Sequence, residues 1–315
     1  MGLYYESTIG TLLVGIFFNT FLYGLVTYQF AAYCRIKFND RPVTKYMVLF
    51  LFILDTVHST SVIYMAWNYL VANYDNPAAL AVAEWPHTFT PIATALAALV
   101  TQLYLGFRIW CLTSSWVLYG VVILLAIPSF VLGVACSIEA WIIKVLSELP
   151  RLTPLVIAWL SMQVIVDAFI TITLIIVFSR SRTGFCKTDT IINRLIRGAI
   201  QTGLFTGIFS MGDLITFVVL PSTDLYGMFA IPIGRIYTNT LLDTLLTRES
   251  LKAEMVNTYD VNAGTGPLRW APTDSSQATS TVQSSSIHLK VQQTVQETCD
   301  RSSTEVDGKV VPLAV

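Results

Sequence analysis

LYGMFAIPIGRIYTNTLLDTLLT, residues 225–247, is the stretch that decides the fold of this chain. It is long enough to cross a bilayer, since about 20 helical residues cover a hydrocarbon core roughly 30 Å thick. It nevertheless carries Arg235, Asn239 and Asp243, whose i, i+4, i+8 spacing predicts one polar helical face. A charge in hydrocarbon is unfavourable, so we expect this face to look inward at other helices.

The composition predicts an integral membrane protein with a polar tail. Of the 315 residues, 54% are hydrophobic and 12% are charged, whereas soluble domains carry about 25% charged residues. Charged residues are sparse before residue 248 and denser after it. The net charge of −1 and the lack of a basic stripe argue against a nucleic-acid partner.

The hydrophobic pattern predicts an all-α bundle of seven transmembrane helices. We expect the spans at about 9–33, 46–70, 87–110, 116–138, 154–178, 198–220 and 225–247. The first, third and fifth connections, with Arg108 at the end of the third span, carry ten Lys and Arg residues, against two in the N-terminus and the other connections. Because basic residues stay cytosolic, we expect the N-terminus outside and the C-terminus inside. The transmembrane domain then covers 1–248, and 249–315 form a disordered, Ser/Thr-rich cytosolic tail.

Strongly polar side chains inside the predicted spans are the candidates for a ligand site or polar cavity. They are Asp55, His58, Asp167, Asp213, Arg235 and Asn239. Asp213 and Arg235 are expected at a similar depth in the membrane, so Asp213 is the expected counter-ion of Arg235. Asp167 is the other candidate. Asp55 and His58 share a helical face, so Asp55 is expected to satisfy His58. Such residues either line a path or pocket, or form interhelical pairs that only fix the bundle.

Motifs of catalysis and metal binding are missing from the sequence. The three histidines, His58, His87 and His288, lie far apart and no Cys or His pair has ligand spacing, so no metal site is expected. Nucleophile and phosphate-binding motifs are also missing. We therefore expect no enzyme activity and no cofactor. No lysine occurs between Lys187 and Lys252 to hold retinal in the last span.

Two further patterns concern packing. Gly203 and Gly207 form a GxxxG pair, for which packing inside the bundle is favoured over dimerisation. The cysteines lie at span ends, inside a span or in the tail, and we expect no structural disulfide.

Several segments resemble a large family of fungal, chiefly basidiomycete, multi-pass membrane proteins with a C-terminal domain of unknown function (DUF6534 type). They are TIGTLLVGIFFNTFLYGLVTYQF (8–30), DRPVTKYMVLFLFILDTVHS (40–59), FRIW (107–110) and GRIYTNTLLDTLLTRE (234–249). The residues at the family's closing signature are Tyr237, Asn239, Leu241, Leu242, Leu245 and Arg248, with Thr240 replacing the usual Ser and Thr247 the usual Asn. The resemblance covers about residues 8–250, and the domain of unknown function covers about residues 160–250 of these. It implies the seven-span plan and a fungal origin, but no substrate.

The leading hypothesis is a receptor-like or sensory protein that binds a small ligand within the bundle. Its partners would be the lipid bilayer and a cytosolic signalling protein at the fifth connection and tail. The alternatives are a transporter or channel that uses the buried Asp and Arg residues, and a non-catalytic scaffold. The location is a membrane, with plasma membrane and endomembrane both open.

Overall fold

The computed structural model describes residues 9–36, 41–73, 84–143, 151–180, 186–220, 223 and 225–263. Side chains of 186–195, 199, 201, 202 and 248–263 are outside this description. The helices are α2 (Thr11–Arg35), α3 (Pro42–Trp67), the short π-helix η2 (Asn68–Ala72), α4 (Trp85–Thr113), α5 (Trp116–Ile143), α6 (Thr153–Arg180), α7 (Cys186–Val219) and α8 (Leu225–Ala263). The described residues contain no strand, which confirms the predicted all-α architecture.

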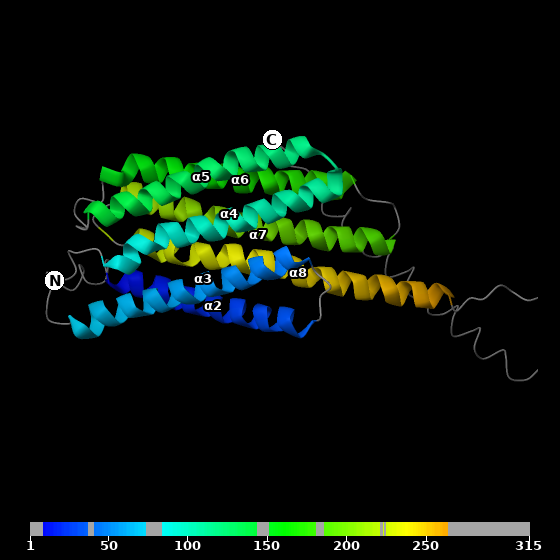
Figure 1. Ribbon diagram of the computed structural model, residues 1–315, viewed down its shortest axis with the longest axis horizontal. Coiled ribbons are helices and arrows are strands. Elements are labelled where there is room, and N and C mark those ends of the chain that lie inside the picture. Colours follow the sequence, from blue (N-terminus) through cyan, green and yellow to red (C-terminus); the bar gives the residue numbers. More distant parts are fainter. Residues whose placement is uncertain are drawn as a thin grey trace, which may run out of the picture.

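The helices run side by side as one elongated bundle (Figure 1). Consecutive helices pack as antiparallel neighbours, as short connections require. The last helix, α8, packs against α2, α3, α4 and α7 and thereby joins the two ends of the sequence. The segment that contains Arg235 therefore lies in the interior, as its polar face predicted.

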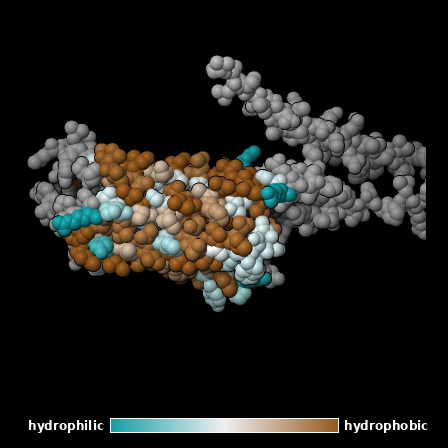
Figure 2. Space-filling model, turned by 90° about the horizontal axis from the view of Figure 1, so that it is seen from above, coloured by the Kyte–Doolittle hydropathy of each residue, from teal (hydrophilic) through white to brown (hydrophobic). Residues whose placement is uncertain are grey.

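The outer surface of the bundle is predominantly apolar. Figure 2 shows brown, hydrophobic side chains over most of the visible described surface. Large side chains such as Phe17, Ile127 and Ile172 are at least half exposed, although water disfavours so large an apolar surface. Six helices of the described residues, α2, α3 with η2, α4, α5, α6 and 196–219 of α7, are long and apolar enough to cross a membrane. The described part of the chain is therefore that of an all-helical membrane protein.

The helix α8 is not among these six, because its polar side chains lower its hydropathy. Between Ile231 and Leu242 nearly every side chain is buried, so these polar groups face protein. The helix also continues through 249–263, which the sequence analysis assigned to the tail, and projects beyond the other helices (Figure 1). Residues 264–315 of that tail lie outside the described residues.

Glycines allow the closest helix contacts. A Cβ atom at Gly15 of α2 would lie 2.8 Å from the Met228 Cα atom of α8, which is too close for any side chain. A Cβ at Gly203 would collide with Thr171 of α6, whereas a Cβ at Gly207 would meet nothing within 4 Å. In the GxxxG pair, Gly203 therefore packs inside the bundle and Gly207 does not.

We expect Gly15→Ala to destabilise the protein by about 1–3 kcal/mol, because its methyl group would push against the α8 backbone. Gly24→Ala on the same helix is the matched control, since its Cβ would have no neighbour within 4 Å. That change should be neutral or stabilising by up to about 1 kcal/mol, because alanine favours helix. Unfolding in detergent checks both; equal stability of the two variants would contradict the close packing of α2 on α8.

Candidate functional site

Arg235 is the centre of a buried polar cluster between α8 and α3. It is 1% exposed, and its Nη1 atom lies 2.9 Å from Oδ1 of Asp55 in an ion pair. Its Nη2 atom lies 2.7 Å from Nδ1 of His58, and Nε donates to the Ser59 hydroxyl at 3.2 Å. Asn19 of α2 also donates to that hydroxyl, at 3.4 Å. The planar guanidinium thus holds three residues of α3 with one rigid fork.

The hydrogen bonds around His58 define its tautomer. A guanidinium only donates, so Nδ1 of His58 accepts from Arg235. The Thr90 hydroxyl donates to the Pro86 carbonyl at 2.9 Å, so it accepts from Nε2 of His58 at 3.0 Å. His58 is therefore neutral with its proton on Nε2, and it connects α8 and α3 to α4.

The counter-ion of Arg235 differs from the one that the sequence predicted. Asp55 pairs with Arg235, whereas Asp213 and Asp167, the expected partners, lie elsewhere. Arg235 is on the side of α8 that faces α3, where Asp55 lies. His58 is satisfied by Arg235 and Thr90 rather than by Asp55.

The predicted polar face of α8 winds around the helix instead of pointing inward throughout. Arg235 is buried, Asn239 is half-buried and donates to the Leu22 carbonyl of α2 at 3.3 Å, and Asp243 is exposed. Four residues of α-helix turn about 400°, so each step of four shifts the side chain by about 40°. Asn239 therefore stabilises the α2–α8 contact and does not reach a cavity.

A second cluster surrounds Asp167 on α6. Gln102 of α4 donates to its Oδ1 atom at 2.9 Å, and the Tyr237 hydroxyl of α8 donates to Oδ2. Gln163 in turn donates to the Tyr237 oxygen at 2.9 Å. Asp167 is thus a junction of three helices, and both carboxylate oxygens already have donors.

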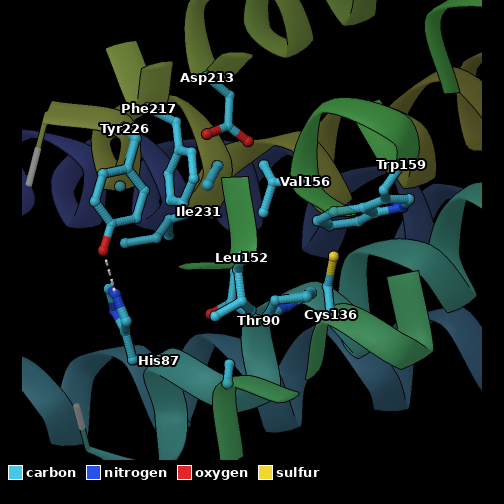
Figure 3. Close-up of a pocket in the computed structure, with 14 residues that line it drawn as sticks. His87, Thr90, Cys136, Leu152, Val156, Trp159, Asp213, Phe217, Tyr226 and Ile231 are labelled. Carbon is cyan, nitrogen blue, oxygen red and sulfur yellow. Dashed lines mark hydrogen bonds between the residues drawn. The ribbon is translucent and has the colours of Figure 1, made fainter. Parts of the chain in front are cut away.

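Asp213 has a different environment from the other buried acids. It is 5% exposed and lines a cavity with a volume of about 80 Å³ at one end of the bundle. We call this the end cavity; its lining is His87, Thr90, Pro91, Cys136, Ala140, Leu152, Val156, Trp159, Asp213, Phe217, Tyr226, Gly227, Ala230 and Ile231. In Figure 3 the Asp213 carboxylate points toward the space that the other residues enclose. Among the described residues no side chain donates to it or pairs with its charge.

The rest of the end cavity is mostly apolar and aromatic. Trp159 lies at one side and Phe217 beside Asp213 (Figure 3). Opposite, His87 and Tyr226 join α4 to α8 through a 2.8 Å hydrogen bond between Nε2 and the phenol oxygen. The cavity volume of about 80 Å³ is several times the roughly 10–15 Å³ that one water needs, so the end cavity has room for a small molecule.

The end cavity is connected to the Arg235 cluster. Thr90 lines the cavity and also accepts the hydrogen bond from His58, which accepts from Arg235. The same helix that provides Tyr226 and Ile231 to the wall carries Arg235 and Tyr237 further along. A molecule in the end cavity would therefore touch both the hydrogen-bond chain and α8.

Sequence reasoning found the buried charges but not most of their partners. Gln102, Gln163 and Thr90 were missed, although two amides inside apolar spans are a readable signal of interhelical hydrogen bonding. His87 was considered only as a metal ligand and Trp159 not at all. The signature residues Leu241, Leu242 and Leu245 are core side chains, and the Arg248 side chain lies outside the described residues.

The comparison with protein families gives one match. Residues 163–250 match the model of a family of unknown function, DUF6534. The match includes Asp167, Asp213 and Arg235 but not Asp55 or His87. It therefore covers only some of the residues that form the two polar clusters and the end cavity. No curated protein and no solved structure matches the chain. The chain is thus a membrane protein with a C-terminal domain of unknown function.

Proposed function

We propose that this is a seven-span, receptor-like protein that binds a small ligand in the end cavity. The main support for this proposal is that the Asp213 carboxylate faces the cavity without a partner among the described residues. Asp55 and Asp167 have partners that account for them structurally. A buried polar group without a partner is unfavourable for folding, so its presence favours a role in binding.

The orientation in the membrane supports a ligand that arrives from outside. The end cavity lies where α4, α6 and α8 begin and where α5 and α7 end. The connections at this end carry two Lys or Arg residues, Lys144 and Arg151. We propose that this end is extracellular or lumenal, with α8 as the seventh span.

The opposite end is the proposed contact for a cytosolic signalling partner. It carries most of the basic residues of the connections, and α8 projects from it (Figure 1). The segments quoted for the family resemblance support a fungal origin. We propose binding without catalysis.

The end cavity is tested with Ala230→Phe, which places a ring into the wall. Protein in nanodiscs is screened by thermal unfolding against metabolite-sized compounds. Compounds that raise the Tm of the parent protein should lose at least about 90% of that shift in Ala230→Phe, because a ligand that binds only the folded state stabilises it. Val131→Phe, at a lipid-facing site of α5 that is 56% exposed, is the matched control and should keep the response.

Two results would overturn the receptor proposal. Ligand responses that persist in Ala230→Phe would place binding outside the end cavity. Saturable uptake of a bound compound into proteoliposomes, lost in Asp213→Asn, would favour the transporter alternative. The ion pair of Asp55 with Arg235 and the donors on both oxygens of Asp167 disfavour that alternative, because transport along a path needs polar groups that are free to bind the substrate.

A further inference from the structure

We propose that the ligand of the end cavity is a small organic cation, such as a protonated primary amine, with Asp213 as its counter-ion. This inference rests on the proposed function and adds the chemical class of the ligand. It starts from the charge of the cavity wall. Asp213 is the one acidic side chain among the described residues of the lining, and no Lys or Arg is among them.

Two described groups that carry or can carry a positive charge are held by other partners. Arg235, the fully buried cation, is held by Asp55, His58 and Ser59 on the α3 side. His87 lies across the cavity and is bonded to Tyr226 (Figure 3). An ionised carboxylate in this environment therefore needs a charge from a molecule that enters.

The aromatic rings of the wall favour an organic cation over an anion or a neutral molecule. Trp159, Phe217 and Tyr226 border the same space as Asp213 (Figure 3). The faces of aromatic rings attract cations at distances up to about 6 Å, most strongly where water is excluded. A carboxylate and several rings around one cavity together repel an anion.

A metal cation fits the wall poorly. Calcium takes six to eight oxygen ligands and magnesium takes six in octahedral geometry, so either ion would need most of its ligands from water at this wall. The described part of the chain contains no group of three His, Cys, Asp or Glu side chains that could hold a metal. The wall offers one carboxylate among apolar and aromatic side chains, which suits a cation that carries its own apolar surface.

The size of the cavity restricts the cation further. A volume of about 80 Å³ suits a short alkylamine, which has few heavy atoms, better than a peptide or a lipid. Its ammonium group would lie at Asp213, and its alkyl chain would lie against Val156 and Ile231, which also border the space (Figure 3).

The test compares n-butylamine with butan-1-ol and butyrate, using protein in nanodiscs at pH 7. The amine is protonated at this pH, since amines of this kind lose their proton near pH 10. We expect the amine to raise Tm saturably, while the alcohol and the carboxylate at equal concentration do not. Asp213→Asn should raise the half-saturating amine concentration at least about tenfold.

The same variant has a readout without ligand. Because Asp213 lacks a partner, Asp213→Asn should unfold at a higher Tm than the parent protein in ligand-free buffer. A carboxylate with a structural role would give a lower Tm instead. Glu139→Gln, at an exposed position near the end of α5, is the matched control and should change neither Tm nor the amine response.

The outcomes separate this inference from the proposed function. Equal stabilisation by butan-1-ol, or an unchanged amine response in Asp213→Asn, would overturn the cation assignment. If neutral or anionic compounds bind and lose their effect in Ala230→Phe, the ligand cavity stands and only its assigned chemistry fails. If no compound depends on Ala230, the proposed function fails as well.

Discussion

Arg235→Met is expected to destabilise the folded protein by about 3–5 kcal/mol, the loss expected when one partner of a buried ion pair is removed. Asp55 would lose its counter-ion in a site that is 0% exposed, Nδ1 of His58 would lose its donor, and the Ser59 hydroxyl would keep only Asn19 as a donor. Folded proteins are stable by about 5–15 kcal/mol in total, so much of the protein should fail to fold. The measurement is the monodisperse fraction after solubilisation, followed by unfolding in detergent.

Two companion variants separate charge from geometry. Arg235→Lys keeps the charge but replaces a planar fork with one ammonium group, so we expect it to recover less than half of the lost stability. The double variant Asp55→Leu/Arg235→Met removes both charges and should be more stable than Arg235→Met alone. The matched control is Arg197→Met at an exposed site of α7. If Arg235→Met were as stable as this control, the buried cluster would not hold the bundle together.

The positions of the helices could be predicted because the lipid environment gives a strong one-dimensional signal. The expected spans 116–138 and 154–178 lie inside α5 and α6, and 225–247 begins with α8. Helix ends were less predictable: α7 begins at Cys186, within the expected fifth connection, and α8 runs on to Ala263. Hydropathy cannot locate these ends, because a helix can continue into water with polar residues.

The pairing of buried charges could not be predicted, because it depends on which helices are neighbours. The sequence offered Asp213 and Asp167 as counter-ions of Arg235, and the actual pairing with Asp55 follows from the packing of α8 beside α3. The end cavity was even less accessible to sequence reasoning. Its wall combines residues from 87 to 231, and no spacing within one helix shows that Asp213 faces Trp159 across it.

Tyr237→Phe is the second large expected effect, a loss of about 1–3 kcal/mol from a single oxygen atom. The Tyr237 hydroxyl donates to Asp167 and accepts from Gln163, so phenylalanine leaves a buried carboxylate oxygen and an amide N–H without these partners. Hydrogen bonds between membrane helices contribute about 0.6 kcal/mol on average. We expect a larger loss here because one of the two bonds involves a carboxylate and both are lost together.

A double-mutant cycle measures this coupling. Asp167→Asn/Tyr237→Phe should lose less stability than the sum of the two single variants, because residues in one hydrogen-bond network are not independent. Tyr28→Phe, at a site that is 73% exposed on α2, is the matched control and should be neutral within about 0.5 kcal/mol. Strict additivity would mean that Asp167 and Tyr237 do not interact. A measured interaction would establish that Asp167 joins α6 to α8 through Tyr237.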